Sequence, residues 1–101
     1  MKISIITATL NSANTVKDTI TSISTQKYSD IEHLIIDGDS SDETINIVKK
    51  NSKENTRIYI EKDDGLYHAM NKGIDLAKGE IIGILNSDDF YANKNVLKSV
   101  E

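Results

Sequence analysis

The chain has 101 residues, with 12 basic and 16 acidic side chains, a formal net charge of −4 and no cysteine. Nucleic acid and anionic membranes need clustered Lys and Arg, so this composition disfavours both as partners. The lack of cysteine excludes a disulfide scaffold, a thiolate metal site and a cysteine nucleophile, and favours a reducing cytoplasm. No stretch approaches the roughly 20 apolar residues of a membrane span, so we expect no transmembrane segment.

Four short apolar runs predict buried strands. They cover residues 2–7, 31–37, 57–61 and 81–86. Isoleucine, a β-branched residue common in strands, accounts for 16 of the 38 apolar residues and is concentrated in these runs. The first run is too short for the apolar core of a signal peptide and is interpreted as a strand.

Helical spacing of apolar residues appears between the runs. A helix over residues 12–25, capped by Asn11 or Ser12, is expected from the stripe Ala13, Val16, Ile20 and Ile23. A second, capped by Ser40 or Ser41, would turn Thr44, Ile45 and Val48 inward and end in the polar run 49–56. A third, ended by Lys78 and Gly79, is expected from the stripe Leu66, Met70, Ile74 and Ala77. A last helix is expected from residue 93 onward.

The order of elements predicts one α/β domain over residues 1–101. Strands that are apolar on both faces and alternate with helices imply a mainly parallel sheet in a three-layer α/β/α arrangement. Ligands of such sheets bind at the carboxyl ends of the strands.

Carboxylates follow three of the four predicted strands, within residues 37–42, 63–64 and 86–89. Carboxyl ends of parallel strands share one edge of the sheet, where like charges repel unless a cation joins them. Oxygen ligands favour a hard divalent ion, so the sequence predicts magnesium or manganese.

Four segments, SIITATLN, IIDGDSSDET, DDGLYHAMNKG and ILNSDD, stand in this order along the chain. Together they resemble the family 2 nucleotide-diphospho-sugar glycosyltransferases, over essentially the whole chain. The resemblance implies the Rossmann-like, donor-binding half of a GT-A fold. It also implies transfer of a sugar, commonly from a UDP donor, to an acceptor hydroxyl with inversion, in cell-surface polysaccharide or glycan synthesis.

By this resemblance, Thr7 and the turn through Asn11 border the nucleobase of the donor. The family usually has Pro where this chain has Ala8, and Tyr where it has Leu10, so Leu10 would form a smaller apolar wall. Read without the resemblance, this segment is an ordinary strand-to-helix turn.

Asp37 matches the family acid that accepts the N–H of the pyrimidine ring. Uracil offers that donor and cytosine does not, so a carboxylate here would select uracil. Gly38 and Asp39 depart from the usual acid and glycine. The alternatives are that Asp37 closes a turn and that Asp42 serves the N-terminus of the second helix.

Residues 86–89 stand at the place of the family's DxD-type metal motif, with Asn86 replacing its first acid. The resemblance implies that Ser87 and Asp88 contact the donor and that Asp88 and Asp89 hold the cation, which would stabilise the departing UDP. The alternative is an Asx-rich turn.

The segment from Gly65 to Gly73 resembles the family signature beside the donor pyrophosphate. Gly65 and Asn71 would serve donor binding, and Lys72 would contact phosphate or be a surface lysine. His68 replaces an acid and is interpreted as an exposed or capping residue rather than a general base. His33 is interpreted as structural.

Inversion needs a general base for the acceptor hydroxyl. In the family this base lies beyond the metal motif. We therefore expect this chain to be the donor-binding half of a glycosyltransferase domain that is truncated here. We expect it to be inactive alone, and we name no catalytic residue in it. The expected partners are a nucleotide-diphospho-sugar and a glycan or lipid-linked acceptor. We further expect that the chain can self-associate. We expect a cytoplasmic location, with the longer protein able to lie at the inner face of the membrane.

Two other classes of protein share some of these features. A nucleotidyltransferase shares an acidic metal site but usually has a glycine-rich basic loop after the first strand, which residues 7–11 lack. A non-catalytic nucleotide-binding or receiver-like α/β module would pair a phosphoacceptor such as Asp37 with a lysine at a later strand end, and no such lysine is found.

Overall fold

The computed structural model describes residues 1–28, 30–62 and 66–85. Its seven elements follow the predicted order of alternating strands and helices. They are β1 (Ile3–Thr9), α1 (Val16–Ser24), β2 (Ile31–Asp37), α2 (Thr44–Asn51), β3 (Thr56–Ile60), α3 (Leu66–Leu76) and β4 (Ile81–Ile84). The helix expected from residue 93 lies outside the described residues.

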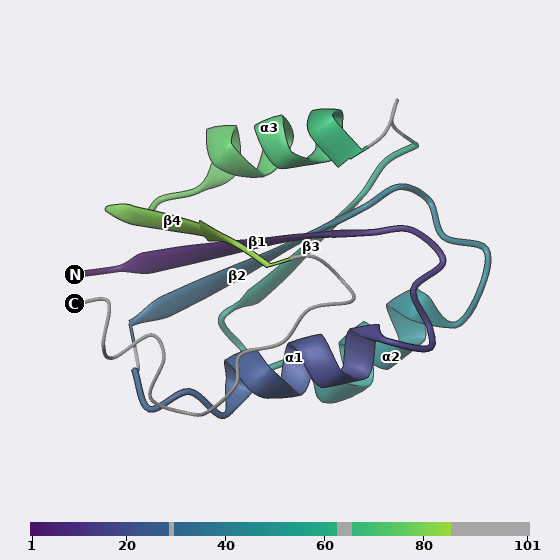
Figure 1. Ribbon diagram of the computed structural model, residues 1–101, viewed down its shortest axis with the longest axis horizontal. Helices are drawn as coiled ribbons and strands as arrows, with labels where there is room; N and C mark the ends of the chain where they lie inside the picture. The colour runs from purple at the N-terminus through teal and green to yellow at the C-terminus, as the bar shows by residue number, and fades with distance from the viewer. Residues whose placement is uncertain (29, 63–65, 86–101) are drawn as a thin grey trace.

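The strands form one parallel sheet in the order β3-β2-β1-β4. Helices α1 and α2 lie against one face, and α3 covers the other (Figure 1). The prediction of a three-layer α/β/α arrangement is therefore confirmed. Among the described helices, none is long and apolar enough to span a membrane.

The two central strands carry the core. Every residue of β2 is buried, and so is every residue of β1 except the half-buried Ala8. Side chains alternate between the faces of a strand, so Ile3 and Ile5 pack with Ile23 of α1. Ile6 and Leu34 point the other way and pack with Ala69 of α3. The isoleucine-rich runs thus fill both faces of the sheet.

Helix α1 begins four residues later than predicted, at Val16 rather than residue 12. The backbone N–H groups of Ser12 and Ala13 donate instead to Thr44 and Asp42 in the neighbouring loop. The side chains of both predicted caps also bond elsewhere, Ser12 Oγ to the backbone of Leu10 and the Asn11 oxygen to the Ser41 N–H, so neither caps the helix. The predicted caps of α2 are also wrong, because Asp42, rather than Ser40 or Ser41, accepts from the Thr44 N–H at 3.0 Å.

The buried face of α3 differs from the predicted stripe. Ala69 and Gly73 are buried, whereas Ile74 is 42% exposed. A Cβ on Gly73 would lie 2.4 Å from Ile6 Cγ2, so the helix packs on β1 through small residues rather than through the larger ones.

Gly79 also differs from its predicted role as a helix-ending glycine, because α3 ends at Leu76. Its N–H donates to Ser4 Oγ at 2.7 Å. A Cβ on Gly79 would lie 2.5 Å from that same oxygen. Gly79 is therefore required by close packing against β1.

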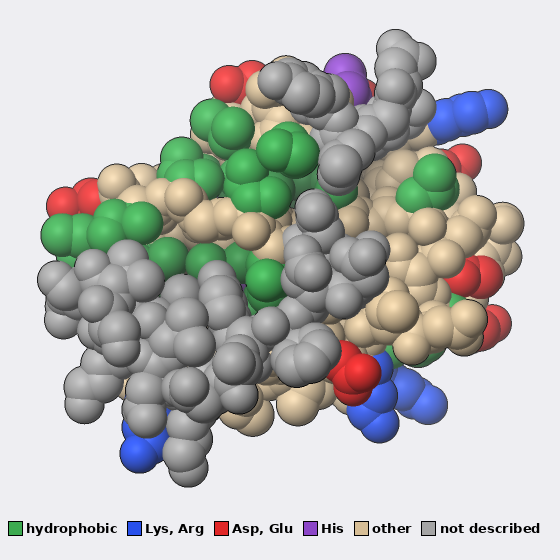
Figure 2. All heavy atoms as spheres, in the orientation of Figure 1, with side chains coloured by type: hydrophobic (Ala, Val, Ile, Leu, Met, Phe, Trp, Pro, Cys, Tyr) green, Lys and Arg blue, Asp and Glu red, His purple; other side chains and the backbone are tan. Residues whose placement is uncertain are grey.

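Apolar side chains gather on the surface over α3 and β4 (Figure 2). Ile74, Ile82 and Ile84 are each more than 40% exposed. In β4, Ile82 and Ile84 alternate with half-buried residues, because β4 lies at the edge of the sheet formed by the described strands, so its predicted burial on both faces does not hold.

Candidate functional site

Strands β1 and β2 end side by side, and their last residues are joined through their side chains. Thr9 and Asp37 are register partners. The Thr9 hydroxyl donates to Asp37 Oδ1 at 2.6 Å, and the Gly38 N–H donates to the Thr9 carbonyl at 2.9 Å. This polar pair marks the carboxyl edge of the sheet, where parallel α/β sheets bind ligands.

Asp37 is fully buried and holds three hydrogen bonds. Besides Thr9, Ser40 donates twice, from its hydroxyl to Oδ1 at 2.6 Å and from its N–H to Oδ2 at 2.7 Å. The carboxylate therefore closes the turn after β2, which was one of the two roles predicted for it. These bonds leave one acceptor site on Oδ2, and contact with a ligand would require the buried carboxylate to be uncovered.

The loops that follow β1 and β2 are fastened to each other around Asn11. Its N–H donates to Ser40 Oγ at 2.9 Å, and its side-chain oxygen accepts from the Ser41 N–H at 2.9 Å. Asn11 has φ 49° and Asp39 has φ 70°, the left-handed region that Asn and Asp tolerate better than most residues. The two loops thus form one wall at the edge of the sheet.

Asp42 serves the start of α2, as the structural alternative predicted. Its carboxylate accepts from the hydroxyl and N–H of Thr44 and from the N–H of Ala13. The Thr44 bonds, more than the Ala13 bond, hold the pKa of Asp42 below its usual value.

Thr7 was predicted to border the nucleobase. Its side chain is fully buried, and its Oγ1 is hydrogen-bonded to His33 Nε2 at 2.8 Å. The Thr7 hydroxyl therefore supports the sheet beneath the edge. Burial lowers the pKa of His33 to about 3, so the imidazole is neutral and structural, as predicted.

The end of β3 contributes an exposed ionic cluster. Glu61 forms an ion pair with Lys72 of α3, and its Oε1 lies 3.9 Å from His68 Nε2. Lys72, mainly through its hydrogen bond and charge, holds the pKa of Glu61 below its usual value. In this structure Lys72 is paired with Glu61, and His68 is half-exposed, as predicted for a non-catalytic histidine.

The remaining predicted donor residues are distributed as follows. Leu10 lies directly after β1 and is 58% exposed, so it is free to form an apolar wall. Asn71 is exposed on α3. Gly65, Ser87, Asp88 and Asp89 lie outside the described residues.

The predicted convergence of carboxylates stays a prediction, because residues 63–64 and 86–89 lie outside the described residues. In the described part of the chain, no group of three or more His, Asp or Glu side chains is placed to hold a metal ion. Asp37 and Asp42, the carboxylates after β2 that were considered for this edge, are both engaged in hydrogen bonds.

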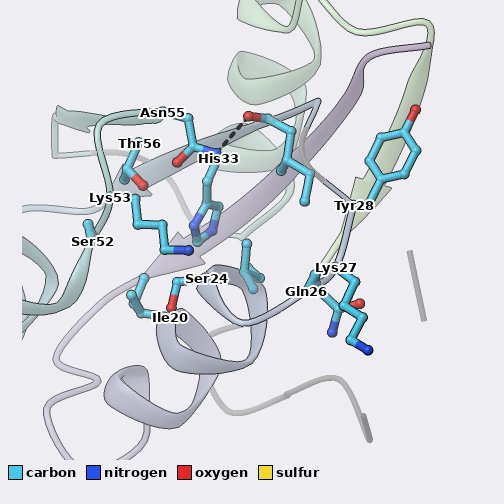
Figure 3. Close-up of a pocket in the computed structure, with 12 residues that line it drawn as sticks. Ile20, Ser24, Gln26, Lys27, Tyr28, His33, Ser52, Lys53, Asn55 and Thr56 are labelled. Atoms are coloured by element: carbon cyan, nitrogen blue, oxygen red, sulfur yellow. Dashed lines mark hydrogen bonds between the residues drawn. The ribbon is translucent and has the colours of Figure 1, made fainter. Parts of the chain in front are cut away.

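A cavity of about 230 Å³ lies at the opposite, amino-terminal ends of β2 and β3. Figure 3 shows the His33 ring pointing into it, beside Lys53 and above Ile20 and Ser24. Ser52 also lines the cavity, and its buried Oγ has no hydrogen-bond partner among the described residues. The cavity is separated from the Thr9–Asp37 pair by the length of β2, so it belongs to a different part of the molecule.

Sequence reasoning placed residues 7–11 beside the nucleobase but missed the hydrogen bonds of Thr9 and Asn11, and it missed Ser40 as part of the site. One signal was available, because Thr7 and Thr9 continue the face of Ile3 and Ile5 and so place hydroxyls on a buried face. The bonds between the two loops carry no sequence signature.

A parallel sheet with helices on both faces and a polar cluster at its carboxyl edge defines an α/β protein of the class that binds ligands at that edge. The chain belongs to the glycosyl transferase family 2, whose family model matches residues 4–101.

Curated relatives are longer than this chain. A PGL/p-HBAD biosynthesis glycosyltransferase of Mycobacterium bovis is 39% identical over 96% of this chain and 39% of its own length. The putative teichuronic acid biosynthesis glycosyltransferase TuaG of Bacillus subtilis is 31% identical over 98% of this chain and 40% of its own length. The chain thus spans about two fifths of these relatives.

Solved structures share the GT-A fold. The structure of S. aureus TarS 1–349 in complex with UDP-GlcNAc has a TM-score of 0.91 and 30% identity, over 99% of this chain and 30% of that chain. The mannosyltransferase PcManGT of Pyrobaculum calidifontis, in complex with GDP-Man and Mn²⁺, has a TM-score of 0.85 and 24% identity, over 95% and 30% of the two chains. At that identity the second likeness shows the fold alone.

Proposed function

We propose that residues 1–101 form the nucleotide-binding unit of a glycosyltransferase that moves a sugar from a uridine diphosphate donor to an acceptor hydroxyl. The observation that carries this is Asp37, held by Thr9 and Ser40 at the carboxyl edge of the sheet in a family 2 chain. The TarS complex with UDP-GlcNAc supports a uridine donor.

Nucleobase recognition is assigned to the edge formed by the loops after β1 and β2. Asp37 would accept the imide N–H of uracil, and the exposed Leu10 would form the apolar wall beside the base. Cytosine presents an acceptor in place of that N–H, so its complex would leave both acceptors unpaired. Thr7 lies beneath this edge and helps to hold β1 in place. Asn71 and Gly65 are proposed to contact the rest of the donor.

A divalent cation is assigned to Asp88 and Asp89, with Ser87 and Asp88 beside the donor. The hard carboxylate oxygens suit either manganese or magnesium, and the choice between them is left to experiment. Bound there, the cation would neutralise the diphosphate and stabilise the leaving UDP. The chain is acidic overall and has a single arginine, so it offers no cluster of arginines to neutralise the diphosphate.

The acceptor is proposed to be a glycan or a lipid-linked glycan in cell-surface polymer synthesis, and attack by its hydroxyl inverts the anomeric centre. The name of the TuaG relative, a putative teichuronic acid glycosyltransferase, supports this class. A reducing cytoplasm is the proposed location, because the chain has no cysteine. Membership of family 2 favours this function over a nucleotidyltransferase or a non-catalytic module.

Calorimetric titration of the purified chain with UDP, CDP and GDP, each with manganese, tests the nucleotide assignment. UDP should bind at least tenfold more tightly than CDP, which corresponds to about 1.4 kcal/mol, the scale of one unpaired polar group. Equal affinity for the three nucleotides would contradict recognition of uracil by Asp37.

A further inference from the structure

We propose that Thr9 determines nucleobase specificity by leaving Asp37 a single acceptor site, on Oδ2, which suits the one N–H of uracil and not the paired donors of guanine. This inference rests on the proposed function, because it concerns the carboxylate to which the nucleobase is assigned there. It adds to that function a specificity-determining residue and a base that this residue rejects.

The hydrogen bonds of the Asp37 carboxylate are shared unevenly between its two oxygens. Oδ1 accepts from the hydroxyls of Thr9 and Ser40, both at 2.6 Å, whereas Oδ2 accepts from the Ser40 N–H at 2.7 Å. An ionised carboxylate has about four lone-pair sites, two on each oxygen. Oδ1 is therefore filled, and within the described residues Oδ2 keeps one open site.

The contacts around Asp37 keep the open site on Oδ2. Ser40 donates to both oxygens, so turning the carboxylate would break both of its bonds. The backbone is held on each side as well, because the Gly38 N–H donates to the Thr9 carbonyl and the Glu61 N–H donates to the Asp37 carbonyl, both at 2.9 Å. The two oxygens are thus not interchangeable.

Thr9 is the residue that decides how many oxygens can accept a ligand. It stands opposite Asp37 in the register of β1 and β2 and is 4% exposed, and its β-branched side chain has few rotamers. Loss of its hydroxyl would open a site on Oδ1 and leave both Ser40 bonds in place. Asp37 would then have one open site on each oxygen.

Nucleobases differ in the number of donors that they present to one carboxylate. Uracil has a single imide N–H. Guanine has a ring N–H beside an amino group, and a carboxylate with a site on each oxygen can accept both side by side, as it accepts the paired donors of an arginine. With Oδ1 filled, the amino group of guanine would be buried without a partner, which costs binding free energy. Thr9 thereby favours uracil over guanine.

The test measures binding of UDP, GDP and IDP, each with manganese, to the wild type and to Thr9→Val. IDP keeps the purine ring and ring N–H of GDP but lacks the amino group, so it controls for the size of the base. The wild type should bind UDP most tightly and GDP no more tightly than IDP. Thr9→Val should bind GDP about three- to tenfold more tightly than IDP, the scale of one net hydrogen bond. Thr9→Ser, which keeps the hydroxyl, should behave like the wild type.

Two results would overturn the inference. One is a folded Thr9→Val, or the smaller Thr9→Ala, in which the ratio of GDP to IDP affinity equals that of the wild type. The other needs no variant, because tighter binding of GDP than of IDP by the wild type would show that both oxygens already accept. Failure of the wild type to bind any uridine nucleotide would contradict the proposed function, and the inference with it.

Discussion

Thr9 and Asp37 stand opposite each other at the ends of the two central strands, and the hydroxyl of Thr9 donates to the carboxylate of Asp37 at 2.6 Å. The bond couples β1 and β2 at the edge where the proposed donor binds. Both residues are buried, so the same contact serves the stability of the fold and the proposed recognition of the nucleobase.

Asp37→Asn should therefore affect both properties. The substitution keeps the size of the side chain but sets an NH₂ group against one of the donors from Thr9 and Ser40. We expect a loss of about 1–3 kcal/mol in the free energy of unfolding, measured with urea, and weaker UDP binding in the presence of metal. Asp39→Asn is the matched control, because it makes the same charge change at an exposed residue with φ 70°. Similar behaviour of the two variants would contradict the assignment.

The buried His33 predicts how stability depends on pH. Its pKa falls from 6.5 to about 3 on folding, so between these values the unfolded chain binds a proton that the native protein does not. Stability should be full above pH 6.5 and decline as the pH falls, by about 2 kcal/mol between pH 7 and pH 5. Urea unfolding across this range, above the usual titration of carboxylates, measures the effect.

His33→Gln should flatten this dependence because it removes the titrating group. His68→Gln should retain it, because His68 is half-exposed beside Glu61. An unaltered pH slope in His33→Gln would show that another group is responsible.

Removing the Glu32 carboxylate should cost more stability than removing its ion-pair partner Arg57. Burial raises the pKa of Glu32, but hydrogen bonds from the Ser4 hydroxyl, the Lys78 N–H and Arg57 outweigh that effect and lower it overall. Glu32→Ala should cost about 2–4 kcal/mol, because it leaves buried donors unpaired. Arg57→Ala should cost less, because Arg57 is 38% exposed and the carboxylate keeps two donors. Chemical denaturation of both variants decides the order, and a larger loss for Arg57→Ala would contradict it.

Replacing Gly73 of α3 with alanine, a better helix former, should lower the stability of the protein. In a free helix Gly→Ala gains about 0.5–1 kcal/mol. Here the new Cβ would lie 2.4 Å from Ile6 Cγ2, so we expect Gly73→Ala to destabilise by about 1–3 kcal/mol. Thermal unfolding measures it, with Asp75→Ala on the exposed side of the same helix as the control. A stabilised Gly73→Ala would show that α3 does not pack as closely as described.

Much of the fold could be predicted from the sequence because the apolar runs are short and separated by helical periods. β2 was predicted with its observed bounds, and the element order was correct. The face of α3 could not be predicted, because spacing favours large apolar residues such as Ile74, whereas the helix packs through Ala69 and Gly73. Close approach of backbones is a tertiary property that hydrophobic periodicity does not contain.

The candidate site was predicted by residue type and not by geometry. Asp37 was identified at the correct edge of the sheet, but the loop that bonds it is held by a contact between Asn11 and Ser40, which are 29 residues apart in sequence. The start of α1 was predicted wrongly for a related reason, because Ser12 Oγ bonds the backbone of Leu10 and no side chain caps the helix. Contacts within and between loops decide these features.

The central claim is that this chain binds a uridine diphosphate through a metal ion and Asp37. It is tested most directly by calorimetric titration of UDP into the wild type and into Asp89→Asn, each with manganese and with EDTA. We predict that the wild type binds UDP at least tenfold more tightly with manganese than with EDTA, and that Asp89→Asn loses most of this difference. Equal affinity of the wild type under the two conditions would contradict the account.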